Sequence, residues 1–489
     1  MAIFLAIAVC QALLPTPLPL RSPPFTALRA SRISLALETE GGSVFEGVNL
    51  DYEAINKAQE SLDKKREEEA AADAAAAWLE LESAVPASSD AAAPVLTLYR
   101  DTNGWCPFCE RVWLQLLVKG VPFREELIDL RDKPEWYKEM VPTTLVPAVK
   151  YDADEKVTWE SVDVMRELEE RFPDSPPLLP PDGTPERAHA EAMMESCSAL
   201  LSSGVRMSYP NASATDEERA EATRAFETEL TKLNDAVAKG GGPFMAGKEF
   251  SLVDCMYIPM MERWAVQLPI TTGMTIRGGD SNTYPALTEW FDAIESVDLL
   301  PAYAQTVQGD AYSWSALVGT FQRMFSGNMT DPHKLAKAKQ TILSADKQAA
   351  SVLGKLKESS LFEHHEKADR YAAASKLLSN RENVLDDLVL SEPKSQTNLR
   401  RLPLDDRPIV EKGLREVCRR LLDIPDAGEA WAESAADAAI VAQGCKYVAR
   451  RICAPRDMGA KAASAMRAAL LQVAAEAEMY AWKSSGGLL

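Results

Sequence analysis

The stretch TNGWCPFCERVWL, residues 102–114, places two cysteines three residues apart at the expected start of an amphipathic helix. Pro107 stands where the first helical turn begins, and a proline there sacrifices no hydrogen bond. Apolar residues then recur at helical spacing as far as Gly120. We therefore expect Cys106 at the N-terminal end of a helix and Cys109 one turn inside it.

This placement gives the two thiols different chemistry. The unpaired backbone N–H groups and the dipole of a helix favour an anion at its start, so Cys106 forms a thiolate more readily than a free thiol does. We interpret Cys106 as the candidate nucleophile. Cys109 shares its helical face and is placed to attack a mixed disulfide at Cys106, and a packed core role is the alternative. Arg111 is a further candidate to stabilise the thiolate, depending on where its side chain points.

Two closely spaced cysteines also occur in metal sites. None of the four histidines lies near Cys106 or Cys109 in the sequence, and neither a second CxxC pair nor two histidines at finger spacing accompany them. The adjacent His364 and His365 would face apart on a helix. We expect no metal site, and we expect the eight dispersed cysteines to be reduced thiols.

The length and charge of the chain limit its classes of function. With 489 residues it is too long for one ordinary core, so two or three domains are expected. The formal net charge of -20 argues against nucleic acid and anionic membrane as partners, because both repel an acidic surface. A small soluble substrate fits this surface better.

The first 37 residues have the composition of a targeting presequence. They contain no Asp or Glu, three arginines are interleaved with Ser, Thr and Pro, and residues 2–14 form an apolar run too short to span a bilayer. An apolar leader before a basic, hydroxylated tract resembles the bipartite presequences of algal plastids. We expect import into a plastid, with another organelle or the cytoplasm as alternatives. Residues 38–93 then read as a disordered or helical linker.

The order of elements expected over residues 94–175 indicates the fold class. It runs strand, helix, strand, helix, strand, strand, helix. The expected strands are residues 95–101, 122–130, 147–153 and 156–160, and the helices follow Cys106, Asp132 and Glu160. This is the βαβαββα order of an α/β thioredoxin-like domain.

With that order, the chain resembles the N-terminal domain of cytosolic-type glutathione transferases. In pattern it is closest to the cysteine-bearing omega, lambda and dehydroascorbate-reductase classes, and WCPFC also resembles glutaredoxin. The resemblance extends over residues 94–308 and implies glutathione as co-substrate. It departs from the omega-like pattern at Cys109, where Ala or Ser is usual, and so leaves open a one-thiol or a dithiol mechanism.

The resemblance also implies a glutathione site at five positions. Val146 and Pro147, in TTLVPAV, match the family's cis-proline turn, whose backbone pairs with the cysteine of glutathione. Glu160 and Ser161, in TWESVDV, match the pair that holds the γ-glutamyl group. Lys133 matches a lysine that faces the glycyl carboxylate. Taken singly, these residues also read as an ordinary strand start, a helix cap and a surface lysine.

Two helical regions are expected to follow a proline-rich linker. Residues 184–308 match the all-α C-terminal domain of glutathione transferases, with Ser251 and Asp254 as a structural capping box. Cys197 and Cys255 lie on apolar helical faces and are expected to be buried. Residues 313–489 show apolar residues at i, i+3 and i+4, which indicates an additional helical bundle of unknown role, with an interhelical turn at residues 453–459.

The function expected from these features is glutathione-dependent thiol transfer. Cys106 would reduce disulfides, glutathionylated substrates or dehydroascorbate, so the partners are small-molecule or protein thiol substrates, and a homodimer is one possible assembly. The alternatives are a dithiol glutaredoxin-like oxidoreductase, conjugation of glutathione to electrophiles, and a glutathione-binding scaffold without catalysis.

Overall fold

The computed structural model describes ten segments of the chain. They are residues 52–86, 93–208, 214–278, 282–295, 311–326, 332–359, 365–389, 402–425, 432–454 and 456–485. The expected presequence, residues 1–37, lies outside the described residues, as does His364.

Helix α2, Tyr52–Ala84, occupies most of the expected linker. Its alanine, glutamate and lysine residues have high helix propensity. Two exposed ion pairs, Lys64–Glu68 and Lys65–Glu69, join residues one turn apart at 3.8 Å. The sequence left a disordered or a helical linker open for residues 38–93, and the structure shows a helix over Tyr52–Ala84.

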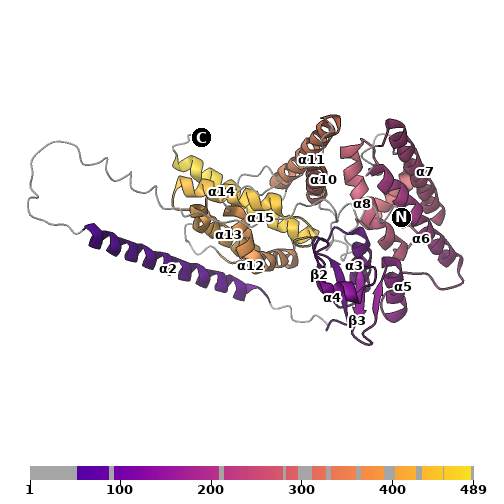
Figure 1. The fold of residues 1–489 in the computed structure, drawn as a ribbon, viewed down its shortest axis with the longest axis horizontal. Coiled ribbons are helices and arrows are strands. Elements are labelled where there is room, and N and C mark those ends of the chain that lie inside the picture. The colour runs from indigo at the N-terminus through magenta and orange to yellow at the C-terminus, as the bar shows by residue number, and fades with distance from the viewer. Residues whose placement is uncertain are drawn as a thin grey trace, which may run out of the picture. The chain divides into compact units, whose positions relative to one another are not determined.

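A four-stranded sheet carries the cysteine helix (Figure 1). The elements are β1 (Leu96–Asp101), α3 (Pro107–Lys119), β2 (Phe123–Ile128), α4 (Glu135–Met140), β3 (Ala148–Tyr151), β4 (Val157–Trp159) and α5 (Ser161–Arg171). The strand order is β2-β1-β3-β4, with β1 and β2 parallel and the other two pairs antiparallel. The βαβαββα order expected from the sequence is confirmed, and the strands are shorter by one to a few residues than the apolar runs.

Helix α3 begins and ends where its local sequence directs. Pro107 occupies the first turn, and Gly120 takes the left-handed conformation, φ 64°, that ends the helix. The helix packs against β1 and α5 and, on its other side, against α8. Val112, Leu114 and Leu116 are fully buried there, so the start of α3 is held by packing on both sides.

Four helices follow the sheet: α6 (Pro185–Ser208), α7 (Asp216–Gly240), α8 (Leu252–Thr271) and α9 (Pro285–Ile294). Phe226 of α7 meets Trp264 of α8 edge to face, with ring centroids 4.9 Å apart. Cys197 and Cys255 are buried, as expected. All the cysteines of the described residues are unpaired, in agreement with the expectation of reduced thiols.

The expected capping box at the start of α8 is confirmed and extends further than the sequence shows. The buried Asp254 carboxylate accepts the N–H and the O–H of Ser251, each at 2.8 Å. It also accepts Met245 N–H at 2.9 Å and the indole N–H of Trp290 at 2.8 Å, which ties α9 to α8. Burial raises the pKa of Asp254, and these hydrogen bonds oppose that rise.

The described residues after α9 are mainly helical, as expected. Its elements are α10 (Ala311–Ser326), α11 (Pro332–Ser359), α12 (Lys367–Val389), the 3-10 helix η3 (Leu404–Asp406), α13 (Arg407–Leu421), α14 (Ala435–Arg451) and α15 (Ala460–Ser484). Helices α10 and α11 pack as a pair, and α12 to α15 pack as a bundle. Gly413 and Gly444 allow the close approach of Val441 and Val410 across α13 and α14, because an added Cβ would lie 2.6 Å and 2.8 Å from those side chains.

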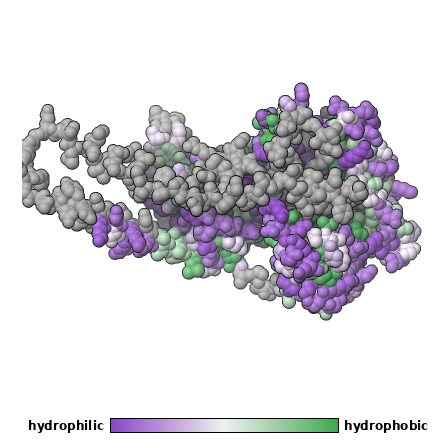
Figure 2. Space-filling model, in the orientation of Figure 1, coloured by the Kyte–Doolittle hydropathy of each residue, from purple (hydrophilic) through white to green (hydrophobic). Residues whose placement is uncertain are grey.

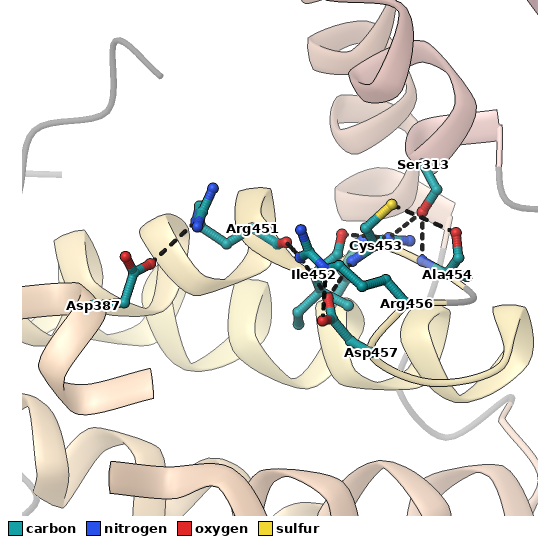
Figure 3. A network of polar contacts seen from close by, with 9 residues as sticks. Ser313, Asp387, Arg451, Ile452, Cys453, Ala454, Arg456 and Asp457 are labelled. Atoms are coloured by element: carbon teal, nitrogen blue, oxygen red, sulfur yellow. Dashed lines mark hydrogen bonds and ion pairs between the residues drawn. The ribbon is translucent and has the colours of Figure 1, made fainter. Parts of the chain in front are cut away.

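A network of hydrogen bonds holds the turn between α14 and α15 (Figure 3). Ser313 of α10 accepts the N–H of Ala454 at 2.9 Å and the guanidinium of the buried Arg467 at 3.1 Å. Within the turn, the Asp457 carboxylate accepts Cys453 N–H at 2.7 Å and Asp457 N–H donates to Cys453 O at 2.9 Å. The described residues of the expected interhelical turn, 453, 454 and 456–459, thus lie between α14 and α15, and the turn is joined to α10.

The surface around β3 is hydrophilic (Figure 2). Ion pairs cover it, among them Arg124–Asp152 at 2.5 Å and Lys156–Glu167 at 2.8 Å. Among the described residues, no helix combines the length and the apolar character that crossing a bilayer requires.

Candidate active site

Cys106 stands at the junction of a turn, a helix and a proline loop. It is the residue that precedes α3, with φ −70° and ψ 115°, and its side chain is half-buried. Its sulfur lies 4.0 Å from the carbonyl oxygen of Val146. The Val146–Pro147 bond is cis, as the sequence led us to expect. A reagent that reaches the sulfur therefore also meets the backbone of this loop.

The buried carboxylate of Asp101 lies behind the cysteines. It accepts hydrogen bonds from Trp105 N–H at 2.7 Å and Cys106 N–H at 3.2 Å. These two N–H groups therefore donate to Asp101 and not to the Cys106 sulfur. A carboxylate oxygen of Asp101 and the sulfurs of Cys106 and Cys109 lie within 4.8 Å of one another. Among the described residues, these three side chains are close enough to one another to bind a single metal ion. The sequence reading missed Asp101, although an Asp that ends a strand ahead of a tight turn is a usual hydrogen-bond acceptor for that turn.

Cys109 is buried directly behind Cys106. Its exposed fraction is 1%, and it packs with Tyr99, Ile128 and Tyr137. Burial raises its pKa well above the ordinary value, and the neighbouring Cys106 and Asp101 raise the pKa further. Cys109 is therefore a neutral thiol within 4.8 Å of the outer sulfur.

Two side chains hold the loop that precedes Pro147. Lys133 Nζ donates to the carbonyl of Thr144 at 2.7 Å, and the hydroxyl of Tyr137 donates to the carbonyl of Leu145 at 2.7 Å. Partial burial lowers the pKa of Lys133, and the nearby Cys106 opposes this effect when its sulfur is charged. Because an ammonium group has three N–H donors, Lys133 keeps two for another acceptor.

Glu160 and Ser161 form the start of α5. Glu160 is exposed and has φ 67° and ψ 115°, a conformation that non-glycine residues rarely adopt. Ser161 is the first helical residue and is 7% exposed. The first N–H groups of the helix have no partner inside it, so the Ser161 hydroxyl and these donors together suit a carboxylate.

A buried ion pair connects α8 to the cysteine turn. Arg263 Nη2 donates to the carbonyl of Trp105 at 3.0 Å, and Nη1 lies 2.7 Å from Glu110 Oε2. Glu110 is 1% exposed, one residue beyond Cys109. The sequence reading missed both residues, and no local signal marks them because they lie 153 positions apart.

Arg111 does not support the Cys106 thiolate, which corrects the possibility left open by the sequence. Its Nε donates to the carbonyl of Met256 at 3.0 Å and its Nη2 contacts the sulfur of Cys197 at 3.4 Å. The side chain is buried between α3 and the helical part. Arg111 therefore has a packing role in this arrangement.

Comparisons with known proteins place both parts of this site in one family. Residues 105–171 match the family model of the glutathione S-transferase N-terminal domain, and residues 216–293 match that of the C-terminal domain. The chain is 34% identical to "Protein IN2-1" of Zea mays over 41% of this chain and 76% of that protein. It is 32% identical to "Glutathione S-transferase L2, chloroplastic" of Arabidopsis thaliana over 42% of this chain and 63% of that protein.

Among solved structures, glutathione transferase Omega 3C from Trametes versicolor aligns with a TM-score of 0.37 and 26% identity. The alignment covers 43% of this chain and 90% of that one. The family models and the identity to the maize protein lead to one conclusion: the chain belongs to the glutathione S-transferase superfamily.

Proposed function

We propose that this protein is a glutathione-dependent thiol transferase with Cys106 as its nucleophile. The observation that carries the proposal is the half-buried Cys106 sulfur at a helix start, 4.0 Å from the Val146 carbonyl. A thiolate is the reactive form of cysteine, and the start of a helix favours it. The other six described cysteines are buried, so Cys106 is the one placed to react.

The same neighbourhood fits glutathione group by group. The backbone of Val146 pairs with the cysteinyl unit of glutathione, beside the Cys106 sulfur. Ser161 and the first N–H groups of α5 take the γ-glutamyl carboxylate, and the exposed Glu160 takes its ammonium group. Lys133, with two N–H donors to spare, faces the glycyl carboxylate.

The reaction proceeds by two thiol–disulfide exchanges. The Cys106 thiolate attacks the glutathione sulfur of a glutathionylated substrate, forms a mixed disulfide with it and releases the substrate thiolate. A second glutathione thiolate then attacks the same glutathione sulfur. Oxidised glutathione leaves, and Cys106 returns to the thiolate, so electrons and sulfur bonds balance. Disulfides and dehydroascorbate are the other oxidised substrates of this proposal.

A dithiol cycle is the second candidate, because the two sulfurs lie within 4.8 Å of each other. In that cycle Cys109 attacks the Cys106 sulfur of the mixed disulfide, glutathione leaves as its thiolate, and an internal disulfide remains for further glutathione to reduce. Burial works against it, since a thiol whose pKa is raised well above the ordinary value is a poor attacking group at neutral pH. We therefore favour the one-thiol mechanism over the dithiol cycle, over conjugation and over a non-catalytic scaffold.

Turnover of a small glutathione mixed disulfide tests these alternatives. We expect Cys106→Ser to abolish turnover and Cys109→Ser to retain most of it. Loss of turnover in both variants indicates the dithiol cycle instead. A parent protein that binds glutathione but shows no turnover with any of the three substrate classes contradicts the enzymatic proposal and supports a scaffold.

We also propose import into a plastid. The acid-free composition of residues 1–37 supports it, and one of the Arabidopsis relatives is named as chloroplastic. Fusion of residues 1–93 to a fluorescent protein tests this proposal, and a diffuse cytoplasmic signal contradicts it. A homodimer is a further proposal, and sedimentation of the full chain at several concentrations tests it.

A further inference from the structure

One buried carboxyl group lies beside the Cys106 sulfur, and a second lies one helical turn along α3. Asp101 is 3% exposed, and its carboxylate lies within 4.8 Å of the sulfur. Glu110 lies one helical turn beyond Cys106, because its backbone N–H donates to Cys106 O at 3.1 Å. Its carboxylate is buried. Negative charges that water does not screen disfavour a second anion beside them. The helix start alone therefore does not explain a reactive thiolate at this position.

Two cations face this cluster from different elements. Lys133 precedes α4 and is turned to the carbonyl of Thr144. Arg263 comes from α8, is mostly buried, and contacts the residue directly before Cys106 through the Trp105 carbonyl at 3.0 Å. The charged and titratable groups around the sulfur and Arg263 are Asp101, Cys109, Glu110, Lys133, Tyr137 and Glu262.

We infer that Arg263 is a positioning residue for Cys106: it fixes the turn before the cysteine and supplies the positive charge that offsets Asp101 and Glu110. This inference rests on the proposed function, in which the Cys106 thiolate is the nucleophile. It makes the helical part of the chain a component of the reactive centre. Removal of Arg263 then disfavours ionisation of Cys106, although no direct contact between the two side chains is required.

The shape of the guanidinium group explains why an arginine stands here. Nη2 binds the Trp105 carbonyl in the turn while Nη1 binds the Glu110 carboxylate of α3, so one planar group holds the turn and the helix together. Nη1 also donates to the carbonyl of Pro259 on its own helix. A lysine keeps the charge but has a single nitrogen, and it cannot hold both partners in one fixed geometry.

The electrostatics agree with this geometry. Burial alone would lower the pKa of Arg263, but Glu110, Glu262 and the Cys106 thiolate outweigh it, and the pKa of Arg263 is raised. One interaction free energy acts on both groups: the thiolate stabilises the charged arginine by the same amount as the arginine stabilises the thiolate.

The test is the pH dependence of Cys106 alkylation by iodoacetamide, followed by mass spectrometry of the full chain without glutathione. We expect the pH midpoint to rise by about one unit in Arg263→Gln. In Arg263→Lys the midpoint should rise by less than half as much, because the lysine keeps the positive charge. Glu110→Gln removes a negative neighbour and retains the Trp105 contact, so its midpoint should fall. A role in packing alone does not produce shifts of opposite sign.

Arg166→Gln is the matched control, because it breaks an ion pair on α5 that is more exposed and should leave the midpoint unchanged. If Arg263→Gln does not fold, Glu110→Gln and Arg263→Lys decide the question. Unchanged midpoints, or a rise in Glu110→Gln, overturn the inference. Failure of the proposed function is a separate result: the parent protein then shows no turnover with glutathione, whatever the midpoints are.

Discussion

The sulfur of Cys109 lies within 4.8 Å of the sulfur of Cys106 and has almost no exposed surface. The two cysteines of CPFC are thus unequal: the outer sulfur is partly exposed, and the inner one is a buried, neutral thiol behind it. This difference decides which of them reacts first.

The first prediction concerns selective labelling. In the native protein at neutral pH, iodoacetamide should modify Cys106 and leave Cys109, Cys197 and Cys255 unmodified, since burial raises the pKa of each of the three buried thiols. Peptide mapping of the labelled protein measures this. All of them should react after denaturation. Labelling of Cys109 as fast as Cys106 would show that the inner thiol is open to solvent.

The second prediction concerns glutathione affinity. Ser161→Ala and Lys133→Ala should each weaken glutathione binding about tenfold, which corresponds to ~1.4 kcal/mol. The reason is that each variant removes a donor to one carboxylate of the tripeptide. Isothermal titration calorimetry measures the dissociation constants.

Matched controls lie nearby on the surface. Ser175→Ala removes a hydroxyl that serves its own loop, and Lys138→Ala removes an exposed ammonium paired with Glu135. Both should bind glutathione as the parent does. If the two controls and the two site variants weaken binding equally, glutathione does not occupy this cradle.

The third prediction is a pH dependence of stability. Arg166, with help from Arg187, holds the pKa of Glu191 at about 2, below its ordinary value of 4.5, and so joins α5 to α6. A carboxyl with a lowered pKa stabilises the folded chain above the ordinary value, and this contribution is lost as pH falls toward the folded pKa. Glu191→Gln should therefore cost about 1 kcal/mol at pH 7, after allowance for solvent screening.

Urea unfolding at several pH values measures this cost. The difference between parent and Glu191→Gln should shrink from about pH 5 downward and vanish near the folded pKa of Glu191. Glu195→Gln, on the exposed side of the same helix, should differ little from the parent at any pH. A constant difference between parent and Glu191→Gln across this range contradicts the ion-pair origin.

The fourth prediction concerns packing in the helical part. Gly204 of α6 lies against the rings of Trp264 and Phe226, and an added Cβ would lie 2.8 Å from Phe226 and still closer to Trp264. Both rings are fully buried and cannot move aside easily. Gly204→Ala should destabilise the chain by about 1–3 kcal/mol, which a urea titration detects. Ser202→Ala on the same helix is the control, and equal stability of the two variants would show that the contact is looser than described.

The local features of this fold could be predicted from short stretches of sequence. Pro107 and Gly120 mark the ends of α3 because each suits one end of a helix. Ser251 and Asp254 mark the start of α8 by their spacing. The order of strands and helices followed from such signals, and it defined the site that Cys106 belongs to.

The electrostatic partners of Cys106 could not be predicted in the same way. Arg263 meets Trp105 across 158 positions of sequence, and nothing in ERW distinguishes it from a surface arginine. Arg111 shows the reverse case: it is close to Cys106 in sequence, but its side chain turns to Met256. The direction of a long side chain depends on tertiary packing, which sequence spacing does not contain.

The last helices illustrate a further limit. Apolar residues at helical spacing predict that a face is buried, but they do not say against what or for what purpose. Ser313 joins α10 to the turn after α14 through Ala454, and no motif announces this contact. The bundle is therefore understood as architecture, and its role is not part of the proposed function.

The most direct test of the central claim is the mass of the protein after incubation with oxidised glutathione. We predict the gain of one glutathione, located on Cys106 by peptide mapping, and no gain in Cys106→Ser. Dithiothreitol should remove the adduct, because it is a mixed disulfide. An adduct on a different cysteine, or no adduct while glutathione also fails to bind in calorimetry, would contradict the account.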